Sequence, residues 1–214
     1  MALSLSYEEL AGCRDCPRLS AHLATVREAH PDYHCQPVAA WGSPRARLLI
    51  VGLAPGLHGA NRSGQPFTGD ASGTFLFAAL SRFGLASDPD PSRARLHNVR
   101  ITNAVKCLPP GNRPLPSEIR QCGQFLRIEI DQLWSERARK PRCVLCLGHL
   151  AHDALGHVLG QKLPAFRHGQ ILQLKHNFWF ADTYHPSRQN TNTRRLTAEM
   201  FDAVIHCAAR LVAV

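Results

Sequence analysis

Three short apolar segments, each followed by a helix-like segment, constrain the fold of this 214-residue chain more than any other feature. Residues 47–52 read Arg-Leu-Leu-Ile-Val-Gly, residues 99–105 Val-Arg-Ile-Thr-Asn-Ala-Val and residues 143–148 Cys-Val-Leu-Cys-Leu-Gly. Apolar runs that do not alternate with polar residues are typical of parallel strands buried on both faces. We therefore expect a strand at each of the three places.

Between and after these runs the sequence predicts helices and one pair of strands. Helical patterns with capping or stop signals cover residues 72–83, 117 to about 134, 149–159 and 193–212, and residues 170–174 and 178–181 suit a strand pair. The alternation of strand and helix predicts an α/β fold. We expect a single domain over residues 1–214, a three-layer α/β/α arrangement with a mainly parallel central sheet of about four strands.

Charge and apolar length limit the class of protein. The chain has 25 Lys and Arg against 16 Asp and Glu, and this surplus favours a polyanionic partner, although many basic proteins bind no nucleic acid. The charged first 25 residues argue against a secretory signal, and no run reaches the roughly 18 apolar residues of a membrane span. We expect a cytoplasmic protein that does not contact membranes.

Two pairs of cysteines suit a metal centre. Cys13 and Cys16 are separated by two residues, and Cys107 and Cys122 bracket a proline-rich loop. Four thiolates fit either zinc or an iron–sulfur cluster, and reduced structural cysteines are the alternative for the first pair. Disulfides are not expected in a reducing compartment.

The other four cysteines are predicted to be core residues. Cys143 and Cys146 also form a C-x-x-C pattern, but residues three apart on a strand point to opposite faces, so both cannot readily reach one metal. Cys35 and Cys207 are expected in the core because free cysteine is among the most buried residue types.

The reactive site of an open parallel sheet lies beyond the carboxyl ends of its strands. Three polar loops are expected there: a glycine-rich loop over residues 52–73, the end of the second strand at Asn103, and residues 184–190. The glycine-rich loop lacks both the Gly-Lys-Ser/Thr ending of a P-loop and the G-x-G-x-x-G spacing of a dinucleotide fold. Neither a nucleoside triphosphatase nor a dinucleotide enzyme is therefore expected.

These loops resemble a known family. Residues 52–56 read Gly-Leu-Ala-Pro-Gly and residues 185–187 His-Pro-Ser, and between residues 58 and 70 the chain carries His-Gly, Asn-Arg and Pro-Phe-Thr-Gly-Asp. In combination these motifs are similar to the uracil-DNA glycosylase superfamily, and within it to family 5, the type b enzymes. The resemblance runs from Cys13 to about Thr197. It implies a monofunctional DNA glycosylase that removes uracil to start base excision repair. We also expect other deaminated bases such as hypoxanthine as substrates, because a loop without a dedicated polar activator need not be tuned to uracil alone.

The resemblance also implies a cofactor and catalytic roles. A structural 4Fe-4S cluster would be held by Cys13, Cys16, Cys107 and Cys122. His185 would donate a hydrogen bond to the oxyanion of the departing base. Asp70 would orient water or stabilise the sugar cation, although Asp before Ala-Ser-Gly is also a good helix N-cap.

Leu53 occupies the position where related families place a polar or acidic residue that activates water, and a leucine cannot polarise water. Asp70 is the nearest acid within the same loop. His58 and Asn61 are lesser candidates for holding the water.

The resemblance assigns the remaining site residues to base and DNA contacts. Phe67 would stack on the base, unless it is a core residue, and Asn103 would bond the uracil edge, unless it only ends its strand. Arg188 and Gln189 would fill the gap left by the flipped nucleotide. The remaining substrate candidates are Gly52, Ala54 and Asn190. Arg194 is a candidate for DNA contact because it borders the polar stretch 189–193, which suits phosphate and sugar contacts.

The expected partners are double-stranded and single-stranded DNA that contains deaminated bases, bound by a monomer. The alternative function is a non-catalytic or RNA-directed nucleic-acid-binding protein that keeps the fold and the cluster. Loss of Asp70, Asn103 or His185 would have favoured that alternative, and all three are present.

Overall fold

The computed structural model describes residues 7–134 and 138–213. They form one six-stranded sheet with the order β1-β3-β2-β4-β6-β5. Its four central strands are parallel, and β1 and β5 pair antiparallel at the two edges. The strands are β1 (Trp41–Gly42), β2 (Leu48–Gly52), β3 (Val99–Asn103), β4 (Arg142–Leu147), β5 (Ile171–Lys175) and β6 (Phe178–Thr183).

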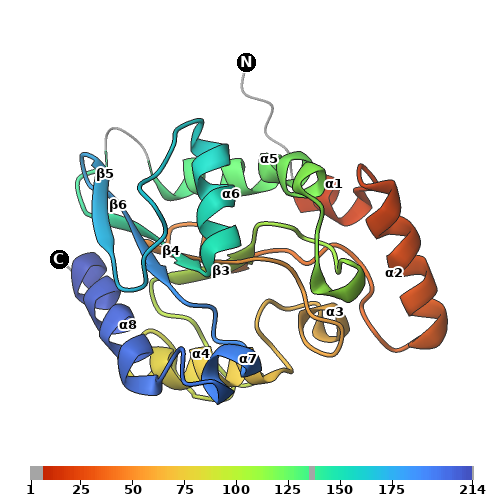
Figure 1. The fold of residues 1–214 in the computed structure, drawn as a ribbon, viewed down its shortest axis with the longest axis horizontal. Coiled ribbons are helices and arrows are strands. Elements are labelled where there is room, and N and C mark those ends of the chain that lie inside the picture. The colour runs from red at the N-terminus through yellow and green to blue at the C-terminus, as the bar shows by residue number, and fades with distance from the viewer. Residues whose placement is uncertain (1–6, 135–137, 214) are drawn as a thin grey trace.

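Helices cover both faces of the sheet. Figure 1 shows α5 (Pro116–Leu133) and α6 (His149–Leu159) above it, and α4 (Ala71–Arg82) and α8 (Ala198–Ala213) below it. Along β2, Leu48 and Ile50 pack into the core between the sheet and helices α4 and α8. Leu49 and Val51 pack into the core between the sheet and helices α5 and α6. This alternation makes three layers, because successive side chains of a strand point to opposite faces. The helices are α1 (Tyr7–Gly12), α2 (Pro17–Ala29), α3 (Ala60–Ser63), α4 (Ala71–Arg82), α5 (Pro116–Leu133), α6 (His149–Leu159), α7 (Arg188–Asn192) and α8 (Ala198–Ala213), with a 3-10 turn η1 (Pro110–Asn112).

The mainly parallel α/β sheet is confirmed, but the count of about four strands was wrong. The prediction missed β1, whose two residues are too few to show any periodicity. The strand pair 170–174 and 178–181 corresponds to β5 and β6, and both join the main sheet. Since β1 and β5 pair antiparallel at the two edges, they extend the sheet without changing its parallel centre.

The closing helix was predicted to start too early. Residues 193–212 were expected to form one helix, whereas α8 begins at Ala198 and a separate short helix, α7, precedes it. Arg194 adopts a left-handed φ of 56°, which a right-handed helix cannot contain. The Ser187 side chain accepts a hydrogen bond from the Asn190 backbone N–H and so begins α7. The expected loop 184–190 is therefore partly helical.

Three of the four predicted core cysteines are buried. Cys143 and Cys146 lie in the two different cores on opposite faces of the sheet, and Cys35 is 1 % exposed. The prediction for Cys207 was wrong, because this residue is exposed. It lies on α8, whose buried face comprises Phe201, Val204, Ile205, Ala208 and Val212, and position 207 falls outside that stripe.

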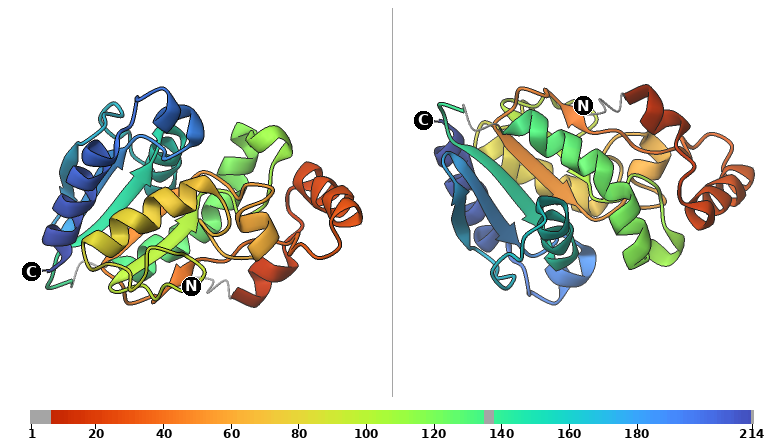
Figure 2. Two further views of the ribbon diagram at one scale, coloured as in Figure 1. Left: turned by 90° about the horizontal axis from the view of Figure 1, so that it is seen from below. Right: turned by 90° about the horizontal axis from the view of Figure 1, so that it is seen from above.

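The N-terminal helices α1 and α2 were not predicted. They lie beside the sheet rather than over it, at the right of both views in Figure 2. Among residues 7–134 and 138–213, no helix has the length and apolar character needed to cross a membrane.

Candidate active site

A pocket of about 260 Å³ lies at the carboxyl ends of the parallel strands. It brings together five of the residues expected to bind or act on a base: Ala54, Phe67, Asp70, Asn103 and His185. They come from segments up to 131 positions apart in the chain, which the sheet collects at one edge. The other lining residues are Gly56, Ala60, Ser72, Asn112 and Ser187. A larger hollow of about 640 Å³ beside α6 contains none of the expected site residues.

The floor of the pocket depends on a glycine. Gly52 ends β2 and pairs with Asn103, which ends β3. A Cβ atom at position 52 would stand 2.5 Å from Asn103 Oδ1 and 2.7 Å from Phe67 Cζ, so only glycine lets the strand pass this close. Gly52 therefore leaves room for the side chains of Asn103 and Phe67 at the pocket, and it does not itself line the pocket.

The Asn103 side chain is buried, yet its amide group is left without a partner among the residues that the structure describes. Asn103 is only 3 % exposed, and none of the described residues makes a hydrogen bond to its amide group. Buried polar groups are nearly always hydrogen-bonded, so an unpaired amide that lines a pocket suits a ligand. The amide carries both a donor and an acceptor.

Phe67 forms a wall of the same pocket in an unusual backbone conformation. Its φ is 54°, and it is 7 % exposed. A Cβ atom at Gly73 would stand 2.0 Å from the Phe67 carbonyl oxygen, so this glycine allows α4 to approach the Phe67 backbone. The Phe67 ring lies 6.1 Å from the His185 ring, measured between centroids. Phe67 thus belongs both to the core under α4 and α8 and to the pocket.

The two carboxylate oxygens of Asp70 have different surroundings. Oδ1 accepts a hydrogen bond of 2.9 Å from the Gly73 backbone N–H and caps α4, so the cap interpretation is confirmed. Oδ2 faces the glycine-rich loop, where a Cβ atom at Gly59 would stand only 2.2 Å away. No described residue donates a hydrogen bond to Oδ2. Capping therefore uses one oxygen and leaves the other available beside the pocket.

His185 follows β6 and packs against the end of β4. A Cβ atom at Gly148 would lie 3.3 Å from His185 Cβ, and Gly148 has a left-handed φ of 93°. Burial lowers the pKa of His185 below its ordinary value, and the nearby negative charge of Asp70 opposes this in part. The imidazole is consequently neutral at neutral pH and has one N–H to donate.

Asn190 supports His185 instead of lining the pocket. Its Nδ2 donates a hydrogen bond of 2.8 Å to the His185 carbonyl oxygen. Arg188 and Gln189 are exposed on α7, next to Ser187 at the pocket, and Arg194 is exposed beyond the helix. None of these three lines the pocket, so their position agrees with contact to a longer ligand around it.

The two lesser candidates for holding water lie outside the pocket. His58 Nδ1 is 2.9 Å from the Tyr33 hydroxyl, and Asn61 is fully buried with its Nδ2 3.5 Å from Cys35 Sγ. Asn112 lines the pocket and was missed. It lies in η1, within the Pro-Pro-Gly-Asn-Arg turn, and the sequence signals a turn there without indicating which surface it meets.

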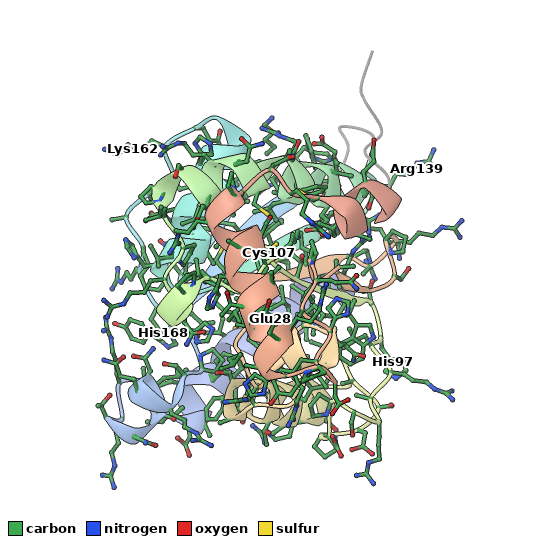
Figure 3. The ribbon with its side chains drawn as sticks, turned by 90° about the vertical axis from the view of Figure 1, so that its right-hand side faces the viewer. Glu28, His97, Cys107, Arg139, Lys162 and His168 are labelled. Carbon is green, nitrogen blue, oxygen red and sulfur yellow. The ribbon has the colours of Figure 1, made fainter. Side chains whose placement is uncertain are left out.

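The four cysteines predicted as ligands share one cavity. Cys13, Cys16, Cys107 and Cys122 line a small hollow of about 20 Å³ beside α1, α2 and α5. Cys107 packs against α2, behind which it lies in Figure 3. Within the described part of the chain, no three or more His, Cys, Asp or Glu side chains could hold a single metal ion.

Burial dominates the acidity of these thiols. Burial, together with the neighbouring thiols, raises the pKa of Cys107 to about 12, and burial raises that of Cys122 to about 11. Cys13 and Cys16 shift in the same direction, mainly through burial. Positively charged iron or zinc would favour the thiolate forms, because a coordinating thiol is deprotonated. The donor set thus fits a thiolate-ligated centre.

The pocket and the cysteine cavity are joined by a short anchored segment. Between Asn103 and Cys107, the backbone N–H groups of Ala104 and Val105 donate to the carbonyls of Gly52 and Leu53. Lys106 then turns inward, fully buried, and its Nζ lies 2.8 and 2.9 Å from the two carboxylate oxygens of Glu129. These contacts hold the segment that links Asn103, in the pocket, to Cys107, in the cysteine cavity.

Comparison with known proteins gives consistent similarities. The family model of the uracil DNA glycosylase superfamily matches residues 39–208. The Type-5 uracil-DNA glycosylase of Thermus thermophilus is 42% identical over 95% of this chain and 95% of its own length. The Type-5 uracil-DNA glycosylase of Pyrobaculum aerophilum is 42% identical over 94% and 89%, and that of Mycobacterium bovis 40% identical over 94% and 79%.

Proposed function

Because the chain belongs to the uracil-DNA glycosylase superfamily, we propose that it hydrolyses the N-glycosidic bond of uracil in DNA and so initiates base excision repair. The observation that carries the proposal is one pocket with an unpartnered buried amide, an aromatic wall, a neutral histidine and a free carboxylate oxygen. A binding protein has no need of this combination. The enzyme interpretation is therefore preferred over the non-catalytic or RNA-directed alternative.

Base recognition falls to Asn103 and Phe67. An enzyme of this kind holds a base that has left the helix, through hydrogen bonds to its Watson–Crick edge and stacking on an aromatic ring. The Asn103 amide can donate to a uracil carbonyl and accept from the uracil N3–H. Phe67 lies directly beside it, since both would contact a Cβ atom at Gly52.

His185 serves the departing base. When the bond between N1 and C1′ breaks, its electron pair leaves with the base and negative charge develops on the uracil oxygen. A neutral imidazole N–H donates to this oxygen without needing to lose a proton. Preorganised donors of this type stabilise developing oxyanions by a few kcal/mol, about 2.7–4 for one donor.

Asp70 serves the sugar and the water. The Oδ2 carboxylate oxygen can orient a water molecule toward C1′, accept one of its protons as the new C–O bond forms, and stabilise the positive charge of the sugar. Leu53 lacks a polar group for this role. Among residues 7–134 and 138–213, no second carboxylate lines the pocket, so the reaction depends on Asp70 and on the good leaving group.

Around the pocket, exposed side chains would contact the rest of the DNA. Arg188 and Gln189 would enter the duplex where the flipped nucleotide was, and Arg194 would contact a phosphate. A pocket without a dedicated polar group at position 53 need not be tuned to uracil alone, so we include hypoxanthine among its substrates. We expect the protein to work as a monomer, in the cytoplasm, with DNA.

For the cysteine cavity we propose a 4Fe-4S cluster on Cys13, Cys16, Cys107 and Cys122. A cluster of four irons and four sulfides is larger than one ion and suits four thiols that share a cavity without meeting around a point. When bound, the cluster supplies cross-linking between α2, the end of β3 and α5. With all four thiolates used, it leaves no open position for substrate.

The proposal is tested by excision from duplexes that carry a single uracil, hypoxanthine or xanthine, with an unmodified duplex as the control. We expect uracil release by the purified protein and its loss in Asn103→Ala. The matched control is Asn177→Ala, because Asn177 precedes the amino end of β6, opposite the edge where the pocket lies. DNA binding without release of any base would favour the non-catalytic alternative.

A further inference from the structure

Three aromatic rings from two distant segments meet on the surface near the pocket. His30 follows α2 and stacks on Tyr33, with centroids 4.5 Å apart and planes inclined by 15°. The His58 ring stands edge-on to both, at 5.9 and 6.0 Å, and its Nδ1 is 2.9 Å from the Tyr33 hydroxyl. His58 is exposed and the other two are partly exposed. We call these three residues the ring cluster.

The ring cluster includes one residue of the glycine-rich loop, His58. A Cβ atom at Gly69 would stand 3.2 Å from the His58 carbonyl oxygen, and one at Gly59 would stand 2.2 Å from Asp70 Oδ2. Residues 58–59 and residues 69–70 therefore lie against each other. In Figure 1, α3 lies between α7 and α2 along the horizontal axis. His58 lies between Gly56 and Ala60 in the chain, and both of these residues line the pocket, so the ring cluster borders the pocket at the start of α3.

We propose that the ring cluster is a stacking platform for an unpaired nucleotide next to the one held in the pocket, an inference that rests on the proposed glycosylase function. Aromatic side chains bind single strands in this way because every base has a flat face to stack on. The DNA strand whose base enters the pocket must continue across the rim of the pocket. Where it crosses the rim beside His58, it meets the ring cluster. The platform would contribute most with single-stranded DNA, whose bases are free to stack.

Stacking, not charge, supplies the contact. Glu28 and Asp32 are exposed near the ring cluster in the sequence, and Figure 3 shows Glu28 on α2. Arg62 is exposed, and its Nη2 lies 3.5 Å from the Gly69 carbonyl oxygen at the same rim. Arg27 is exposed as well, so two acids and two bases offset one another there, and the platform is expected to depend on the rings themselves.

The test uses two series of single-stranded oligonucleotides that carry a uracil near one end and extend from it by one to about six nucleotides, on the 5′ or the 3′ side. Excision is measured as kcat/KM and binding by fluorescence anisotropy. In the wild type, extension on one side should increase both. Tyr33→Leu and His30→Ala should reduce this increase on the order of tenfold and leave the shortest substrate unchanged. Tyr33→Phe, which keeps the ring, should retain it.

Phe83→Leu is the matched control. Phe83 also stacks on a histidine, His206, with centroids 5.2 Å apart, but it follows the C-terminal end of α4, whereas the pocket is at the N-terminal end. An equal loss in Phe83→Leu, or an undiminished increase in both ring-cluster variants, would overturn the platform. Failure of the wild type to excise uracil from any strand would instead contradict the proposed function, and anisotropy on the same strands would still report on the platform.

Discussion

Gly52 and Asn103 are direct partners at the carboxyl ends of neighbouring parallel strands, and a Cβ atom on Gly52 would stand 2.5 Å from Asn103 Oδ1. The proposed base-binding amide therefore keeps its position only because its neighbour has no side chain. The Phe67 ring depends on the same glycine, since its Cζ would be 2.7 Å from that Cβ atom.

Gly52→Ala should accordingly displace Asn103 and Phe67. We expect a loss of about 1–3 kcal/mol in the free energy of unfolding, as for other overpacked cores. We also expect the rate of uracil excision to fall, because Asn103 and Phe67 would no longer be in position to bind the base. Thermal unfolding and single-turnover rates measure the two effects. Gly12→Ala is the control, because a Cβ atom at Gly12 would meet nothing within 4 Å. Unchanged excision in Gly52→Ala would contradict the role of the Asn103 position.

The two oxygens of Asp70 can be separated by substitution. Asp70→Asn keeps an oxygen that can accept from the Gly73 N–H, so its melting temperature should stay close to that of the wild type while single-turnover excision falls on the order of 10²-fold or more. Asp70→Ala should lose the cap as well, at about 1 kcal/mol. A wild-type rate in Asp70→Asn would remove Asp70 from the mechanism.

His185 makes stability depend on pH in a defined direction. Burial lowers its pKa in the folded protein, so the unfolded chain binds the proton more readily. The contribution of neutral His185 to the free energy of unfolding should therefore be fully present above about pH 6.5. It should be lost as the pH decreases from there toward the lowered pKa. In His185→Gln this loss should be smaller. Because burial also lowers the pKa of His168, His168→Gln serves as the comparison.

The purified protein should be yellow-brown if the four cysteines hold an iron–sulfur cluster. Cys107→Ala and Cys122→Ala should lose the colour, the bound iron and sulfide, and much of the stability. Cys207→Ala, at an exposed position, should keep all three. Stoichiometric zinc without iron or sulfide, in protein prepared without oxygen, would refute the cluster.

Arg188 and Gln189 are predicted to fill the gap in the duplex. Replacing both with Ala should weaken binding and excision much more on double-stranded than on single-stranded DNA, where no gap needs filling. Arg210→Ala removes one positive charge from the exposed surface of α8 and controls for charge alone. Equal losses on both substrates would indicate phosphate contact instead of insertion.

Particular elements show which parts of the fold could be predicted from the sequence. The apolar runs at β2 and β4 predicted central parallel strands, because a strand buried on both faces must be apolar throughout. The two-residue β1 was missed because so short a segment has no periodicity. Cys207 was misplaced because residue type alone does not tell which face of α8 it occupies.

The layered α/β fold, the family and the residue types of the site could be predicted from the amino-acid sequence, since these depend on local patterns and motifs. Which of those residues meet could be seen only in the folded protein. The tertiary structure brought Asn103, Phe67, Asp70 and His185 into one pocket, moved Asn190 beneath His185, and gave the two oxygens of Asp70 different surroundings. The reason is physical: contacts between segments far apart in the chain depend on strand order and close packing, and no local pattern records them.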